Sequence, residues 1–303
     1  MAENSGIEWT HHTYNPWIGC TKVSPACDNC YAEAWDKRGL HGKSLRWGPH
    51  ADRTRTKTRS NLRTWNRKAA ELGIRYRVFC ASLADWADNH RSIDPQWRRD
   101  LVSDIRAYKN LDFLLLTKRP QNVAKLYPDL VEEWPVNAWA GASTENREEM
   151  LRRGEALAAL PAKVTFWSAE PLVGDLGIIP PSIMPSWIIT GGESGPKARP
   201  MHPDWARNLR DQCAAAGVAF HFKQWGEWGH ALHMEGVQAL SAATTKTGHW
   251  AHPHRYRIHG GTEDGQCFES FPADHMMLRV GKSTAGRLLD GVIHDGYPAS
   301  VAA

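Results

Sequence analysis

Three cysteines near the N-terminus are the residues of this chain whose type and spacing most directly suggest chemistry. Cys20, Cys27 and Cys30 lie within one short run, NPWIGCTKVSPACDNCYAEAWDKR. An iron–sulfur cluster whose irons are all held by the protein needs four thiolates, so three cysteines leave one iron open. Three cysteines this close together therefore predict a [4Fe-4S] cluster with one iron free to bind another molecule.

A structural zinc ion is the alternative to the cluster. Cys27 and Cys30 form a C-x-x-C half-site and Cys20 could be the third of the four ligands that such a site takes. The fourth ligand could be one of three histidines, His11, His12 or His41. The remaining cysteines are scattered, and we expect them to be buried core thiols, namely Cys80, Cys213 and Cys267.

The cluster interpretation brings a second cofactor with it. The open iron can bind the amino and carboxylate groups of S-adenosylmethionine (SAM), and the protein then positions a cofactor that carries the difficult chemistry. An electron passed through the cluster cleaves the sulfonium bond, and the resulting 5′-deoxyadenosyl radical takes a hydrogen atom from the substrate. This chemistry needs an external electron donor and a site shielded from water.

Short apolar runs alternate with amphipathic segments along the chain, which is typical of βαβ units. The predicted strands are Arg77–Ser82, Leu111–Thr117, Ala138–Ser143, Val164–Ser168, Trp187–Thr190 and Ala219–Lys223. The predicted helices are Asp94–Lys109, Glu145–Leu160 and Pro203–Ala216. Polar residues follow nearly every strand, which favours an α/β fold of the TIM-type (β/α) barrel kind, partial or full, over an open doubly wound sheet.

We expect the barrel to occupy residues 1–228, with a basic insertion at 37–68 and an irregular C-terminal extension at 229–303 packed on it. The insertion holds 11 Lys and Arg and one acid, while the whole chain has a net charge of +4. Mixed basic and aromatic residues suit a phosphate backbone and exposed bases, although a solvated helix and loop would also explain them. The basic residues expected to contact nucleic acid are Arg53, Arg55, Lys57 and Arg59.

Composition and hydrophobic patterning indicate in which compartment the protein works and argue against several motifs. The N-terminal residues contain no apolar signal-peptide segment, and no apolar run is long enough to cross a membrane. Without a signal peptide, we expect the six cysteines to bind metal, act in catalysis or be buried rather than to form disulfide bonds, and we expect the protein to work in a reducing cytoplasm. The histidines of the extension lack zinc-ligand spacing, and the run GKSTAGRLL lacks the spacing of a phosphate-binding loop.

Several runs taken together resemble one family. They are YNPWIGCTKVSPACDNCYAE, LLLTKRP, SAEPL, ITGGESGPKARPMHPDW and FKQWGEW, within residues 14–228. They resemble a phage- and prophage-borne family of uncharacterised three-cysteine proteins that is regarded as radical-SAM-like. The resemblance implies a barrel of the radical SAM kind in a bacterial host cytoplasm, with the three cysteines as cluster ligands and Tyr31 as the aromatic neighbour of the last one. The usual spacing is C-x3-C-x2-C, whereas the first gap here is six residues.

The resemblance also implies where SAM would bind. It assigns Ser82 and Asp85 to the methionine amino group, Ser143 and Glu145 to the ribose, and Gly191, Gly192 and Glu193 to the adenine. The residues left facing the substrate are Lys118, Glu170 and Lys223, with Thr117, Arg119, Arg199 and Glu227 beside them. Glu170 could accept a proton or form an ion pair with Lys118.

The phage association and the basic segment together suggest a substrate. We expect a nucleobase in phage DNA, with a modified thymidine rearranged by an isomerase-type reaction. Two alternatives stay open at this point. One is a radical SAM enzyme that acts on a peptide or small metabolite, and the other is a zinc-stabilised nucleic-acid-binding protein without catalysis.

Overall fold

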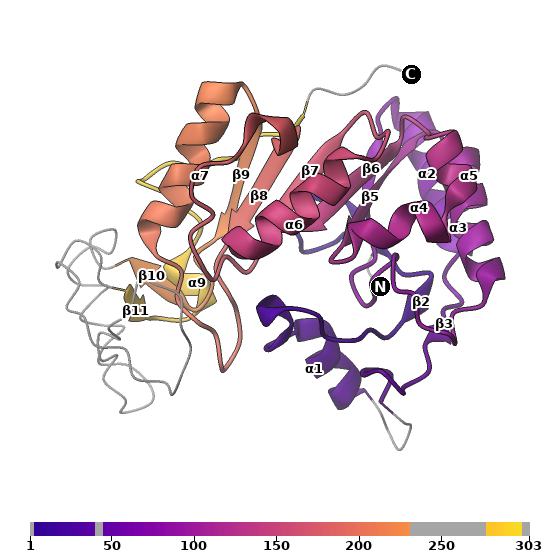
Figure 1. Cartoon of the computed structure of the whole chain (residues 1–303), viewed down its shortest axis with the longest axis horizontal. Helices are drawn as coiled ribbons and strands as arrows, with labels where there is room; N and C mark the ends of the chain where they lie inside the picture. Colours follow the sequence, from indigo (N-terminus) through magenta and orange to yellow (C-terminus); the bar gives the residue numbers. More distant parts are fainter. Residues whose placement is uncertain (1–2, 40–44, 231–276, 299–303) are drawn as a thin grey trace.

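The centre of the molecule is a seven-stranded parallel sheet, seen in a computed structural model that describes residues 3–39, 45–230 and 277–298 (Figure 1). The strands, in spatial order, are β1 (His12–Tyr14), β4 (Tyr76–Cys80), β5 (Leu111–Thr117), β6 (Ala138–Ser143), β7 (Thr165–Ala169), β8 (Trp187–Gly191) and β9 (Ala219–Gln224). Each strand of this sheet pairs with the strand of the same sheet that follows it in the sequence. The strand order therefore never reverses, which excludes the doubly wound alternative. Because β1 and β9 are the two edges, the curled sheet is a half-barrel, which confirms the partial-barrel prediction at this level.

Helices connect successive strands and cover the outer face of the sheet (Figure 1). They are α2 (Ser60–Leu72), α3 (Pro95–Ala107), α4 (Val123–Leu126), α5 (Pro128–Glu132), α6 (Arg147–Ala158) and α7 (Pro203–Ala216), with the 3-10 turns η2 (Pro120–Asn122) and η3 (Pro181–Ile183). Asp94 caps α3, because its side chain accepts a hydrogen bond from the backbone N–H of Gln96 at 2.8 Å. None of the helices in the described ranges is long and apolar enough to cross a membrane.

Smaller elements lie apart from this sheet. The 3-10 turn η1 (Pro25–Cys27) and helix α1 (Tyr31–Arg38) follow β2 (Trp17–Ile18), which pairs with β3 (Thr54–Arg55). The last elements are β10 (Trp228–His230), β11 (Met277–Arg279) and the short helix α9 (Lys282–Ala285). The basic segment 37–68 includes β3 and most of α2. Helix α2 lies in the connection from β1 to β4, so this part of the basic segment belongs to the first crossover of the half-barrel rather than to an insertion.

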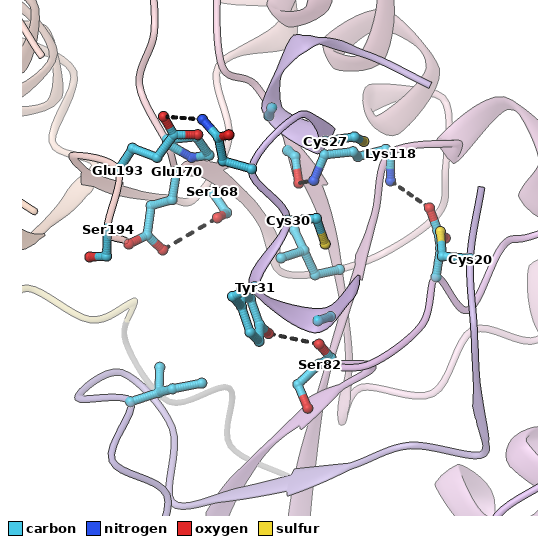
Figure 2. Close-up of a pocket in the computed structure, with 18 of the residues that line it drawn as sticks. Cys20, Cys27, Cys30, Tyr31, Ser82, Lys118, Ser168, Glu170, Glu193 and Ser194 are labelled. Carbon is cyan, nitrogen blue, oxygen red and sulfur yellow. Dashed lines mark hydrogen bonds between the residues drawn. The ribbon is translucent and has the colours of Figure 1, made fainter. Parts of the chain in front are cut away.

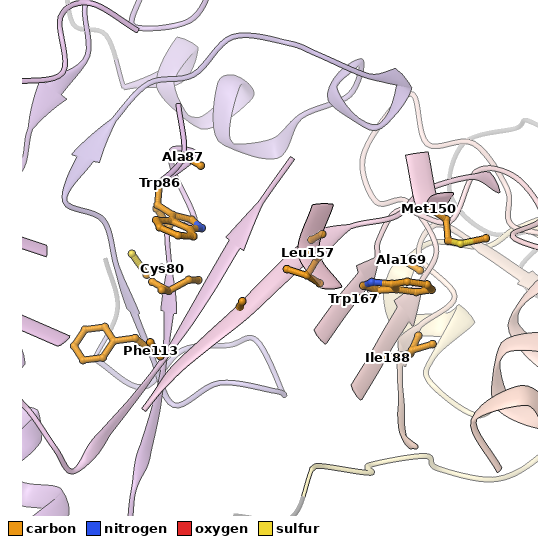
Figure 3. Packing of buried hydrophobic residues seen from close by; sticks show 14 of the residues in the cluster. Cys80, Trp86, Ala87, Phe113, Met150, Leu157, Trp167, Ala169 and Ile188 are labelled. Atoms are coloured by element: carbon orange, nitrogen blue, oxygen red, sulfur yellow. The ribbon is translucent and has the colours of Figure 1, made fainter. Parts of the chain in front are cut away.

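Alternate residues of each strand pack on opposite faces of the sheet, as the pleat requires. On the outer face, Phe113, Trp167 and Ile188 pack among residues from the helices (Figure 3). The core thiols Cys80 and Cys213 are buried on this side as predicted, whereas Cys267 and most histidines of the extension lie outside the described residues.

The concave face of the half-barrel is filled by a second cluster, which is rich in aromatic rings. Its buried members are Trp9, Phe79, Leu114, Trp139, Val164, Phe166, Trp187 and Ile189. A Cβ atom at Gly141 would lie 2.2 Å from Cζ of Phe166, so the glycine makes room for that ring. This cluster forms an apolar base beneath the carboxyl ends of the strands.

Residues 294–297 cover the edge of β9 that faces away from β8. The backbone N–H of Phe222 donates to the carbonyl of His294, and that of Gly296 donates to the carbonyl of Phe220, both at 2.9 Å. Tyr297 then reaches the other side of the half-barrel, where its hydroxyl donates to the carbonyl of Glu8 at 3.1 Å. The described part of the extension thus links the two open sides of the sheet.

Trp187 should be the most sensitive residue of the concave cluster. It is fully buried, and its ring lies 5.3–6.4 Å from those of Trp9, Trp139, Phe166 and Tyr297. We expect Trp187→Ala to lower the free energy of unfolding by about 3–5 kcal/mol, because it leaves a large cavity. Urea unfolding followed by circular dichroism measures this, with the exposed Trp35→Ala as control. Equal effects of the two substitutions would contradict the packing described.

Candidate functional site

A cavity of about 420 Å³ lies at the carboxyl ends of the strands, above the aromatic cluster (Figure 2). The sequence-predicted residues that line it are Cys20, Cys27, Cys30, Tyr31, Ser82, Asp85, Thr117, Lys118, Ser143, Glu170, Gly192, Glu193 and Lys223. They come from the cysteine loop (residues 20–30), the start of α1 and the ends of at least five strands. The fold therefore assembles most of the predicted site from segments that are far apart in the chain.

The three cysteines face this cavity from one loop (Figure 2). Three sulfur donors on one wall are the soft ligands that iron–sulfur clusters and zinc take, so the donor set suits either metal. Within the described residues, however, no three His, Cys, Asp or Glu side chains converge as a group of metal ligands. The thiol of Cys20 is half-buried, and burial raises its pKa to about 12 although the nearby Arg119 guanidinium acts in the opposite direction.

One end of the cysteine loop is held by a buried ion pair. Arg119 Nη1 lies 2.8 Å from Asp85 Oδ2 and 3.6 Å from Cys20 Sγ, while its Nη2 donates to the carbonyl of Thr21 at 2.7 Å. Both partners of the pair are about 7% exposed in their side chains. Arg119 therefore joins the end of β5 to the loop at Cys20.

Asp85 has no acceptor capacity left for a ligand. Besides Arg119, its carboxylate accepts hydrogen bonds from Thr117 Oγ1 at 2.5 Å, from the N–H of Ala87 at 2.9 Å and from the N–H of Lys118 at 3.0 Å. A carboxylate offers about four acceptor positions, and all four are taken. Asp85 lines the cavity, but its geometry is that of a positioning residue rather than of a free partner for an amino group.

The other end of the loop is held by Glu193. Its carboxylate accepts hydrogen bonds from Asn29 Nδ2 at 3.1 Å and from Arg199 Nε at 2.9 Å and Nη2 at 2.7 Å. Arg199 Nη2 also donates to the carbonyl of Pro25 at 3.1 Å. Asn29 was not singled out from the sequence, although its place between two cysteines is the signal that could have drawn attention to it.

Two of the residues that were predicted to bind SAM do not line the cavity, and neither do the substrate-side candidates Arg119, Arg199 and Glu227. Glu145 is fully buried, with Oε2 at 2.6 Å from Arg153 Nη1 and Oε1 at 3.4 Å from the N–H of Ala26. Burial alone would raise the pKa of Glu145, but Arg153 and Lys118 lower it. Its carboxylate thus supports the cysteine loop rather than facing a ribose. Gly191 is a spacer, since a Cβ there would lie 3.1 Å from Glu170 Oε1.

Polar groups from the ends of β5, β6, β7 and β9 also line the cavity. Lys118, after β5, lies next to Cys27, whereas Glu170, after β7, lies on the other side of the cavity from Cys20 and Cys27 (Figure 2). Glu170 pairs with Lys223, with 3.1 Å between Oε1 and Nζ, and not with Lys118 as one reading of the sequence allowed. Lys118 Nζ instead donates to Ser143 Oγ at 3.1 Å (Figure 2). Lys118 thus contributes a cation beside a hydroxyl, and Glu170 and Lys223 contribute an ion pair.

Two further residues shape the cavity, namely Tyr31 at its rim and Gly192 in its wall. The hydroxyl of Tyr31 donates to the carbonyl of Ser82 at 2.7 Å, although the tyrosine as a whole is 59% exposed (Figure 2). A Cβ at Gly192 would lie 1.9 Å from the carbonyl oxygen of Trp225, so only glycine fits this crossing of two backbones.

The four basic residues predicted to contact nucleic acid do not line the cavity. Arg53 is buried, with Nε at 2.9 Å from Asp88 Oδ2, so its guanidinium is not open to a phosphate group. Arg55 forms an ion pair with Asp100, and Arg59 forms one with Asp104. Lys57 is exposed on the surface.

The fold and the site define an α/β half-barrel protein with a cysteine-lined cavity at the carboxyl ends of its strands. The chain belongs to a family described as "Protein of unknown function (DUF5131)", whose family model matches residues 4–298. None of the curated proteins and none of the solved structures compared with the chain matches it.

Removing the charge of Asp85 should destabilise the protein more than removing a surface charge does. We expect Asp85→Asn to lower the free energy of unfolding by about 3–5 kcal/mol, because Arg119 then becomes an uncompensated buried charge. Chemical unfolding measures this, with the exposed Asp52→Asn as control. The double variant Asp85→Asn/Arg119→Met should recover part of the loss, and a single variant as stable as the control would contradict the buried ion pair.

Proposed function

We propose that this protein is a radical SAM enzyme in which Cys20, Cys27 and Cys30 hold a [4Fe-4S] cluster and the cavity binds SAM. The observation that supports this most is that three thiols from one short loop line a single cavity at the carboxyl ends of a parallel half-barrel. When bound, the cluster and SAM together supply the one-electron chemistry that removes a hydrogen atom from a substrate C–H bond. An external protein or reductant would provide the electron.

The apolar residues of the cavity would keep water from the reacting groups. Trp9, Phe79 and Leu116 line it on the side of the concave cluster, and Tyr31 lies at its rim. A closed, dry site protects a reactive species from side reactions. This arrangement is consistent with radical chemistry, which needs such protection.

The polar residues would bind and orient SAM. Lys118 beside Ser143 offers a cation and a hydroxyl to a carboxylate group, and Gly192 lines the cavity where the adenine would lie. Asp85, Glu145 and Glu193 would act as positioning residues, since each carboxylate is engaged by an arginine. Glu170 and Lys223 would then face the substrate.

The proposed substrate is a nucleobase in DNA, with an isomerase-type rearrangement of a modified thymidine as the reaction. A base within a duplex would have to leave the stack to enter a cavity of this size. The surface that supports this idea comprises Arg55, Lys57 and Arg59, which lie on β3 and before α2. The ion pairs that Arg55 and Arg59 form with Asp100 and Asp104 would have to rearrange to neutralise phosphate groups.

Loss of a cysteine of the loop should abolish cluster binding. After anaerobic reconstitution with iron and sulfide, we expect about four irons per chain in the wild type and a loss of most iron in Cys30→Ala, because the cluster needs each of its thiolates. The buried Cys213→Ala serves as the matched control and should keep the iron. Tight binding of one zinc instead of iron, or full iron content in Cys30→Ala, would contradict the proposal.

Removing exposed basic charge should weaken DNA binding. The double variant Arg55→Ala/Lys57→Ala is expected to bind duplex DNA about 3–10-fold more weakly at moderate salt and to reduce the salt dependence, because fewer counterions are released. Fluorescence anisotropy at several salt concentrations measures this. Lys109→Ala/Lys163→Ala, which removes two exposed lysines that precede β5 and β7, is the control. Identical curves for both double variants would contradict the placement of DNA.

A further inference from the structure

We propose that Lys223 and Gln224, at the end of β9, form a subsite that recognises the adjacent N–H and C=O groups of a pyrimidine ring. The inference rests on the proposed function only in taking a nucleobase as substrate. It concerns the part of the cavity at the end of β9 and needs neither the cluster nor SAM.

A bulge in β9 brings the two side chains to the same cavity. Thr190 pairs with Phe222 and Gly191 pairs with Gln224, so Lys223 is an extra residue in the ladder. In a regular strand, consecutive side chains point to opposite faces, whereas a bulge changes the direction of one of them. Both Lys223 and Gln224 accordingly line the cavity.

Gln224 presents an acceptor that lacks a donor. The residue is 7% exposed, and its Nε2 donates to Ser194 Oγ at 2.9 Å. Its Oε1 is buried and has no hydrogen-bond partner among the residues that the structure describes. A buried acceptor without a partner is costly, so a rotation of the amide that brings Oε1 to a ligand N–H in the cavity would be favoured.

Lys223, the preceding residue, presents a donor to the same cavity. Its Nζ lies 3.1 Å from Glu170 Oε1, and an ammonium group has three hydrogens to donate. At least one of them remains for a carbonyl oxygen of a ligand after the bond to Glu170 is made. The end of β9 therefore offers one donor and one acceptor from neighbouring positions.

A cyclic amide fits this pair better than a peptide does. In a trans peptide bond the N–H and C=O groups point in opposite directions, whereas in a pyrimidine ring such as thymine they lie side by side on one edge. The aromatic rings of Trp9, Phe79 and Tyr31 along the cavity suit a flat heterocycle. The chemistry that the subsite selects is thus a cyclic amide edge, and the N3–H and C4=O groups of a thymine or uracil base present such an edge.

Binding of two nucleosides to the full-length protein without cluster tests the subsite. Saturation-transfer NMR titrations with thymidine and with N3-methylthymidine give the two affinities. We expect N3-methylthymidine to bind at least tenfold more weakly, because its methyl group replaces the hydrogen that Gln224 Oε1 would accept. Gln224→Leu should lower thymidine affinity to the same level, and Lys223→Met should weaken it as well, whereas the exposed Gln121→Leu should leave it unchanged.

Several results would overturn the inference. They are equal affinity for the two nucleosides, no thymidine binding at millimolar concentration, and unchanged binding in folded Gln224→Leu, whose fold circular dichroism checks. Displacement of thymidine by the trans amide N-methylacetamide at equal concentration would indicate a peptide site instead. No cluster takes part in this binding test, so a negative result would not affect the iron-binding test. Conversely, selective binding of thymidine by a protein that never binds iron would support the subsite and contradict the radical function.

Discussion

The buried ion pair between Asp85 and Arg119 is the interaction on which the rest of the site depends. It joins the loop after β4 to the end of β5, and through Thr21 and Cys20 it also holds the cysteine loop. Neither charge can be left alone without a large desolvation cost, because both side chains are almost completely shielded from water. The position of Cys20 relative to the half-barrel is therefore set by electrostatics inside the protein and not by the flexibility of a surface loop.

Carboxylates paired with arginines also hold the cysteine loop at Asn29 and at Ala26. Glu193 holds Asn29 and Arg199, and Glu145 with its partner Arg153 lies against the backbone of Ala26. Three carboxylates that the sequence suggested as cofactor ligands are thus occupied with arginines, and each of them supports the loop instead. Among the groups that face the cavity without an arginine partner are Lys118, Ser143, Glu170, Lys223 and Gln224, so these side chains remain for recognition of small molecules.

Local features of the fold were accessible from the sequence, while long-range pairings were not. The predicted bounds of β5, β6 and α7 agree with the structure, because apolar runs and caps are properties of neighbouring residues. The three-residue strand β1 was missed since it is too short to show a pattern. Arg53 was expected at the surface as part of a basic run, yet its partner Asp88 lies 35 residues away. The bulge that turns Lys223 and Gln224 into one cavity depends on the pairing of β9 with β8, which residue types alone do not reveal.

Electron paramagnetic resonance of the reconstituted, reduced protein, recorded with and without SAM, tests the central claim most directly. The claim is that the cysteine loop holds a cluster with one open iron next to the cavity. It predicts the signal of a reduced [4Fe-4S] cluster whose g values change when SAM is added, because SAM binds to the open iron. A signal that is indifferent to SAM, or the absence of any cluster in a protein that binds one zinc ion, would contradict it.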